Sequence, residues 1–309
     1  MTFKDLLRAV RTRQWAKNAL LFGGFIFAGR LRVTPEHPEP LMDGLRVLMA
    51  FACFCALSGA AYIINDWQDL ERDRAHPIKK HRPLASGRIS LRIASFILAA
   101  LLIAAIILVF AVGVSAPGTW GFGVSALCYF ALTLAYSLRL KHEVIIDVLS
   151  VAAGFLVRVV AGCLAVPVVI SPWILFCTFN LALFVALNKR RAELLEVGES
   201  GTTRKVLQGY SVPMLDTFIA VAAGLTIISY SLYTFNAPHT RALGAQFGET
   251  PLLMISVPFV VYGVFRFLLL AHSSPVGGEP EQMLRDKPMI VNAVLWIMLV
   301  SLLTVLSSI

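Results

Sequence analysis

The sequence predicts an all-α polytopic integral membrane protein, and three observations predict it. Hydrophobic residues make up 58% of the 309 residues, charged residues make up 15%, and the mean hydropathy is +0.76. The apolar residues occur in blocks of about 20, the length that an α-helix needs to cross a hydrocarbon core about 30 Å thick. The basic residues gather in alternate connecting segments. This composition excludes a disulfide-stabilised miniprotein, a nucleic-acid module and a disordered chain.

Apolar blocks give nine candidate membrane spans. The first block is short, and no small-residue cleavage site follows it, so we expect a retained helix and not a signal peptide. The expected spans are residues 17–30, 44–64, 93–113, 119–138, 145–163, 172–188, 211–235, 251–271 and 289–308. Nine helices packed around one cavity form the expected architecture.

Positive charges predict the orientation of these spans. With the N-terminus inside, the inner segments carry 21 Lys and Arg residues and the outer segments carry 4, while Arg158 and Arg266 lie inside spans. Cytoplasmic loops of membrane proteins are enriched in Lys and Arg. We therefore expect a cytoplasmic N-terminus and, with an odd number of spans, an outside C-terminus. The same distribution accounts for most of the net charge of +9, so basicity alone does not indicate a nucleic-acid partner.

An acidic cluster follows the second span at the expected inner face. On a helix with about 100° per residue, Asn65, Asp66, Asp69 and Asp73 fall within an arc of about 100°. Carboxylates on one face repel each other unless a cation lies among them, and such hard oxygen ligands suit Mg²⁺, which often also binds substrate phosphates. The cluster predicts a Mg²⁺-diphosphate site. The alternative is a solvated helix end whose acids pair with the Arg and Lys residues that follow.

A basic stretch comes directly after the acids. It contains Lys79, Lys80 and Arg82, and a turn-forming Pro-Leu-Ala-Ser-Gly follows at residues 83–87. This order is consistent with a lid in which Lys79 and Arg82 supply cations to the outer oxygens of a metal-bound diphosphate. Positive-inside charge alone is the simpler alternative.

These motifs carry a family resemblance. The pattern Asn-Asp-x-x-Asp-x-x-x-Asp at residues 65–73, followed by Arg-Pro-Leu-Ala-Ser-Gly at residues 82–87, resembles the first aspartate motif of the UbiA superfamily of intramembrane prenyltransferases. Members usually carry a second Asp-rich motif on the inner loop between spans six and seven. This chain instead has a basic cluster at residues 189–191 with one acid, Glu193. In this departure it is similar to the decaprenyl-phosphate phosphoribosyltransferase branch, which transfers phosphoribose from phosphoribosyl diphosphate to a polyprenyl phosphate.

Three further stretches support that branch. They are residues 11–18, residues 136–141 together with Asp147, and residues 154–162. The match extends from about residue 8 to residue 210. Thr12 stands where the family pattern leads us to expect Pro, a small departure at a helix start.

The resemblance implies roles for individual residues. The basic residues 189–191 would receive the 5-phosphate of the sugar donor, because Arg offers a planar fork to phosphate oxygens. Arg158 is expected at the floor of the polar cavity, since a charge inside a span costs about 2.5 kcal/mol or more unless it faces a partner or water. The alternative for Arg158 is a structural ion pair with an acid of a neighbouring helix. The expected catalytic residues are Asp69, Asp73, Lys141 and Arg158; the expected metal ligands are Asn65, Asp66, Asp69 and Asp73; the expected substrate-binding residues are Gln14, Lys17, Asn18, Lys79, Arg82, Tyr136, Asp147, Lys189, Arg190, Arg191 and Glu193.

The implied reaction joins two phosphorylated substrates with Mg²⁺ as cofactor. An oxygen of the lipid phosphate would attack C1 of the ribose, giving polyprenyl-phosphoryl-5-phosphoribose, a lipid-linked pentose precursor for cell-wall arabinan, and diphosphate. Residues 1–309 would form one catalytic domain in the cell membrane, with the active site facing the cytoplasm. Two alternatives remain. One is an ordinary prenyltransferase acting on an aromatic or quinone precursor, against which the missing second Asp motif counts. The other is a transporter, although the expected pair of broken helices is not evident in the sequence.

Overall fold

The all-α architecture is confirmed. The computed structural model describes residues 2–27, 40–75, 79–166, 168–200, 205–236, 251–273 and 286–306. In these residues, seven helices are long and apolar enough to cross a membrane. The chain divides into two compact units, the first comprising Met1–Arg139 and Gly154–Ile170, the second Leu140–Ala153 and Ser171–Ile309.

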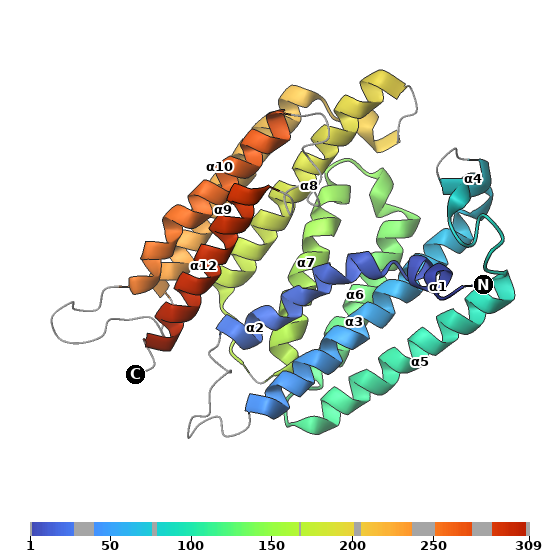
Figure 1. Ribbon diagram of the computed structural model, residues 1–309, viewed down its shortest axis with the longest axis horizontal. Helices are drawn as coiled ribbons and strands as arrows, with labels where there is room; N and C mark the ends of the chain where they lie inside the picture. Colours follow the sequence, from blue (N-terminus) through green and yellow to red (C-terminus); the bar gives the residue numbers. More distant parts are fainter. Residues whose placement is uncertain are drawn as a thin grey trace. The chain divides into compact units, whose positions relative to one another are not determined.

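The first unit is built around the long apolar helix α3 (Pro40–Gln68), which packs along α5 and α6 (Figure 1). Its elements are α1 (Phe3–Ala9), η1 (Thr12–Leu21), α2 (Phe22–Phe27), α3 (Pro40–Gln68), α4 (Leu70–Ala75), η2 (Lys79–His81), α5 (Leu91–Ser115), α6 (Gly121–Leu138) and the end of α7 (Ile146–Ala165). Phe54 of α3 is fully buried, with its ring centroid 6.0 Å from that of Phe122 and 4.7 Å from that of Tyr129. This aromatic contact joins α3 to α6.

The first expected span, residues 17–30, is not one continuous α-helix in the structure. Residues Thr12–Leu21 form the 3₁₀ helix η1, α2 ends at Phe27, and residues 28–30 lie outside the described part of the chain. A Cβ atom at Gly162 of α7 would overlap the carbonyl oxygen of Leu21. The missing side chain of this glycine therefore lets the backbone of η1 approach α7 directly.

The second unit consists of paired helices. Its elements are η3 (Leu140–His142), the start of α7, α8 (Pro172–Ser200), η4 (Lys205–Gly209), α9 (Val212–Asn236), η6 (Leu252–Ser256), α10 (Val257–Ser273) and α12 (Lys287–Leu306). Helix α8 packs along α9, and α10 packs along both α9 and α12. The core includes the buried Phe184 and Phe267, whose ring centroids are 4.8 Å apart.

The structure does not confirm the count of nine spans. The first expected span is broken, and the last, α12, contributes a shorter apolar helix at Lys287–Leu303. Helix α8 is longer than the span expected at residues 172–188, and it carries the basic cluster on a helix, where we expected a loop. No Gly or Pro interrupts residues 173–197, so nothing in the sequence ends the helix at the membrane surface.

Candidate active site

The acidic cluster lies at the end of α3, as the sequence predicts. Helix α3 ends at Gln68 and α4 begins at Leu70, but helical spacing continues across the break. The backbone N–H of Asp69 donates to the carbonyl oxygen of Asn65 at 3.0 Å, and that of Asp73 donates to Asp69 at 2.8 Å. The expected one-sided arrangement of these residues is therefore preserved.

Two of the acids converge on one arginine. Asp66 and Asp73 are both buried. Arg82 Nη1 donates to Asp66 Oδ1 at 3.1 Å and to Asp73 Oδ2 at 2.6 Å. A second guanidinium, that of Arg11, donates to Asp66 Oδ1 at 2.6 Å and lies 4.4 Å from the ring centroid of Tyr62. Arg11 has no assigned role in the sequence prediction, because its contact with Asp66 joins residues 55 positions apart.

The carboxylate and amide oxygens of the cluster are ligands that suit a divalent cation. Among the described residues, however, no three Asp, Glu, His or Cys side chains are already arranged to hold a metal ion. Asp69 lies 3.7 Å from Arg72 as an ion pair and makes a further interaction. Asp66 and Asp73, however, already direct buried carboxylates at a single positively charged nitrogen. Arg82 contacts one oxygen of each carboxylate, so the second oxygen of each acid is the one that a metal ion would bind beside Arg82.

Arg158 is buried, with 9% of its surface exposed, among neutral partners. Its Nε donates to Asn18 Oδ1 at 2.8 Å, its Nη2 donates to Tyr129 Oη at 2.8 Å, and its Nη1 donates to the carbonyl oxygen of Gly154 at 3.0 Å. Tyr129 also shares a 2.9 Å hydrogen bond with Ser58. Within the described residues, no acid pairs with Arg158, so the alternative of a structural ion pair finds no partner there.

The structure thus brings Arg158 and Asn18 together and adds Ser58 and Tyr129, which the sequence did not indicate. Hydroxyl groups inside the second and fourth spans were the available signal, because polar side chains in a membrane span tend to face a protein interior. Their joint position depends on how α3, α6 and α7 pack within the first unit.

A second buried polar group lies in the other unit. Arg190 of α8, 4% exposed, donates from Nε to Asp147 Oδ2 at 2.6 Å and also pairs with Glu193. Tyr210 Oη donates to Asp147 Oδ1 at 2.6 Å and accepts from the backbone N–H of Ile145 at 2.7 Å. Burial and the hydrogen bond to Asp147 raise the pKa of Tyr210. Three expected site residues therefore meet, and Tyr210, which the sequence did not indicate, completes the group.

The three adjacent cations of α8 have different surroundings. Arg190 is enclosed by its ion pairs, and Arg191 Nε donates to Asp216 Oδ1 at 2.6 Å. Lys189 is exposed. Of the expected phosphate receptors on this helix, Lys189 is the accessible one.

The remaining expected site residues are spread over several elements. Gln14 is half-buried and Lys17 is exposed on η1, Lys79 is half-buried on η2, and Tyr136 is half-buried near the end of α6. Lys141 is half-buried on η3 of the second unit. All but Gln14 make additional interactions.

Known proteins that resemble this chain in sequence or in fold agree with one another in family. Residues 21–193 match the UbiA prenyltransferase family. The chain is 30% identical over 297 residues to a decaprenyl-phosphate phosphoribosyltransferase of Mycolicibacterium smegmatis, covering 94% of this chain and 90% of that protein. A protein of the same name from Corynebacterium glutamicum is 32% identical, with 94% and 84% covered. A solved UbiA homolog from Archaeoglobus fulgidus bound to GPP and Mg²⁺ shares the fold, with a TM-score of 0.68, 18% identity and coverage of 97% and 99%.

Proposed function

The chain belongs to the UbiA prenyltransferase family, and from this premise we propose that it transfers 5-phosphoribose from phosphoribosyl diphosphate to a polyprenyl phosphate. The observation that carries the proposal is the 30–32% identity to two decaprenyl-phosphate phosphoribosyltransferases over 94% of the chain. Because 84–90% of those relatives is covered as well, the likeness is not confined to a shared module. The protein is a multi-pass membrane transferase whose products are polyprenyl-phosphoryl-5-phosphoribose, a lipid-linked precursor for cell-wall arabinan, and diphosphate.

The basic cluster on α8 supports the choice of phosphoribosyl diphosphate as the sugar donor. A typical member with two acid clusters would suit a prenyl diphosphate, whereas this chain has Lys189, Arg190 and Arg191 in place of the second cluster. The donor carries a 5-phosphate with nearly two negative charges besides its diphosphate. Lys189 would contact that phosphate directly, and Arg190 would hold the surrounding helix and loop in position through Asp147.

Mg²⁺ is the proposed cofactor, and Asn65, Asp66, Asp69 and Asp73 are its proposed ligands. When bound, the metal would neutralise the diphosphate and make it a better leaving group. The Mg²⁺ bound to the Archaeoglobus homolog supports this choice of ion. Arg82 holds Asp66 and Asp73 through Nη1 alone, and its other N–H groups would donate to outer oxygens of the same diphosphate.

The transfer step is a substitution at C1 of the ribose. An oxygen of the lipid phosphate forms the new bond to C1 while the bond from C1 to the diphosphate oxygen breaks, and the electron pair leaves with the diphosphate. The attacking phosphate is largely ionised near neutral pH, so the step balances without a general base. Arg158, whose partners are all neutral, would offer its positive charge to the sugar or a phosphate, and Lys141 would assist from η3. The proposal assigns the reaction to the cytoplasmic side of the cell membrane, with the N-terminus inside and the C-terminus outside.

Incubation of the purified protein with labelled phosphoribosyl diphosphate, decaprenyl phosphate and Mg²⁺ tests the proposal. We expect label in the lipid phase, and none when EDTA replaces Mg²⁺. A parallel reaction with labelled prenyl diphosphate and an aromatic acceptor is the control. Label appearing only in the aromatic product would replace the proposal with the ordinary prenyltransferase activity of the family.

A further inference from the structure

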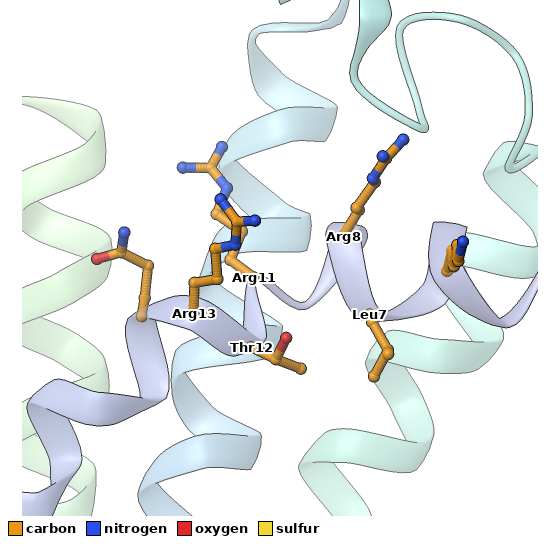
Figure 2. Close-up of a pocket in the computed structure, with 7 residues that line it drawn as sticks. Leu7, Arg8, Arg11, Thr12 and Arg13 are labelled. Atoms are coloured by element: carbon orange, nitrogen blue, oxygen red, sulfur yellow. The ribbon is translucent and has the colours of Figure 1, made fainter. Parts of the chain in front are cut away.

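A basic cavity lies at the N-terminal segment of the first unit, beside the acidic cluster. Its volume is about 460 Å³, and its lining residues are Lys4, Leu7, Arg8, Arg11, Thr12, Arg13 and Gln14. Figure 2 shows Arg8, Arg11 and Arg13 extending to the same side of the segment, while Leu7 points away from them. Four of the seven lining residues are cations and none is an acid. The cavity is therefore built to attract an anion.

Most of this positive charge is not neutralised. Lys4, Arg8 and Arg13 are exposed, and their side chains form no ion pair or hydrogen bond with any residue that the structure describes. The acid on the same helix, Asp5, is engaged elsewhere, since it caps α1 through Thr2 and lies 3.4 Å from Arg88. Three guanidinium or ammonium groups thus remain available to a ligand.

The backbone holds the cavity in shape. Arg11 separates α1 from η1 in the left-handed conformation, with φ 50° and ψ 54°. This conformation is unfavourable for a residue other than glycine, so the surrounding contacts must hold it in place. The salt bridge of Arg11 to Asp66 and its stacking on Tyr62 are such contacts. They fix the turn at Arg11 that connects Arg8 on α1 to Arg13 on η1.

The position of Arg11 also links the cavity to the acidic cluster. Arg11 lines the cavity, and its guanidinium shares the same oxygen of Asp66 with Arg82. The proposed function assigns this cluster to the diphosphate of the sugar donor. A nucleophile that displaces the diphosphate must lie close to the donor, so an anion held in the adjacent cavity is well placed to be the acceptor.

The chemistry of the segment favours a lipid over a soluble anion. Phe3 on α1 is 73% exposed, and Leu7 supplies an apolar part of the cavity wall. A short helix with exposed apolar and basic side chains suits the boundary between lipid headgroups and acyl chains. Guanidinium groups bind the phosphate of such a lipid through paired N–H donors.

We propose that this cavity binds the phosphate group of the polyprenyl phosphate acceptor, with Arg8 and Arg13 as the ligands that contact it. The assignment rests on the proposed function for the identity of the lipid. Arg11 would position the site by holding the turn and joining it to Asp66.

The test measures binding of decaprenyl phosphate in detergent micelles to purified protein, without any requirement for turnover. We compare Arg8→Gln, Arg13→Gln and Arg13→Lys with Arg92→Gln, which removes an exposed cation of the same unit outside the cavity. Each glutamine variant in the cavity is expected to weaken lipid binding about tenfold, Arg13→Lys less, and Arg92→Gln not at all. In the transfer assay Arg8→Gln and Arg13→Gln should raise the KM for the lipid and leave the KM for phosphoribosyl diphosphate unchanged, whereas Arg92→Gln should change neither.

Phosphatidylglycerol and inorganic phosphate, added as competitors, distinguish the sources of an anion. Equal competition by phosphatidylglycerol would overturn the proposal in favour of a general lipid headgroup site, and a change confined to the KM for phosphoribosyl diphosphate would make the cavity part of the donor site. Lys4→Gln, at an exposed and unpaired position, repeats the test should an arginine variant fold poorly. If wild-type protein binds the lipid through this cavity but transfers no phosphoribose, the proposed function fails while the binding site stands.

Discussion

Arg158 and Tyr129 are joined by two interactions at once: Nη2 of the arginine donates to the tyrosine hydroxyl at 2.8 Å, and the guanidinium carbon lies 4.7 Å from the centroid of the same ring. Both residues lie within membrane-spanning helices of the first unit. The partners of the charge are a hydroxyl, an amide and a backbone carbonyl, and the described residues offer it no carboxylate. A buried cation with neutral partners keeps its charge available to an anionic ligand.

The first prediction follows from the geometry of these bonds. Arg158→Lys keeps the positive charge, but an ammonium cannot donate to Asn18, Tyr129 and Gly154 with the fixed fork of a guanidinium. We expect protein that folds, with kcat lowered at least tenfold. Thermal stability in detergent and turnover, measured on the same preparation, check this result. A Lys variant with normal kcat and KM would refute a role at the substrate.

The second prediction concerns the ion pair of Arg190 with Asp147. In the wild-type protein, the side chains of Arg190 and Tyr210 both donate to the fully buried Asp147, and Arg190→Ala leaves only Tyr210 of these two. Removing one partner of a buried ion pair typically costs about 3–5 kcal/mol. We expect a clear fall in the melting temperature in detergent and loss of folded protein. An Arg190 variant of unchanged stability would show that the pair does not support the unit.

The third prediction uses the neighbouring Lys189 as the contrasting case. Because its side chain is exposed, Lys189→Ala should leave thermal stability unchanged within the error of measurement. The 5-phosphate of the donor is charged throughout the reaction, so losing its contact weakens ground and transition states alike. We expect a several-fold higher KM for phosphoribosyl diphosphate with kcat nearly constant. A change only in the KM for the lipid would assign Lys189 to the acceptor.

The long helices could be predicted from the sequence because each depends on a local property, a run of about 20 apolar residues. The acidic cluster was predictable for the same reason, since helical periodicity joins Asn65 to Asp73. The partners of the cluster were not. Arg11 reaches Asp66 across 55 positions of the chain, and such a contact depends on tertiary packing that local periodicity does not encode.

The first expected span shows a second reason why part of the fold could not be predicted from the sequence. The sequence predicts one helix at residues 17–30, yet the part up to Phe27 forms the end of a 3₁₀ helix and a short α-helix. Leu21 also approaches Gly162 closely, on a helix far away in the sequence, and local periodicity does not encode such a contact. Likewise Tyr210 could not be identified, because its role depends on Asp147, 63 residues before it.

The fourth prediction tests that close approach. In Gly162→Ala the added Cβ atom would overlap the carbonyl oxygen of Leu21, so η1 must move away from α7. We expect a melting temperature lowered by several degrees and reduced activity, since Asn18 on η1 would shift relative to Arg158. Gly224→Ala is the matched control, because a Cβ there meets nothing within 4 Å. Equal stability of the two variants would contradict the close packing of η1 against Gly162 of α7.

The last prediction concerns the acids and the metal. Asp73→Asn keeps the size of the side chain but removes the charge that holds Arg82 at 2.6 Å. If Asp73 is a ligand of Mg²⁺, the variant should need at least tenfold more Mg²⁺ for half-maximal activity and reach a much lower kcat. Asp73 lies on the short helix α4, outside the packed spans, so the variant should remain folded. Glu71→Gln, which changes an exposed acid paired with Arg74 on the same helix, should behave like wild type. Wild-type Mg²⁺ dependence in Asp73→Asn, measured by titrating the metal in the transfer assay, would exclude Asp73 from the metal site.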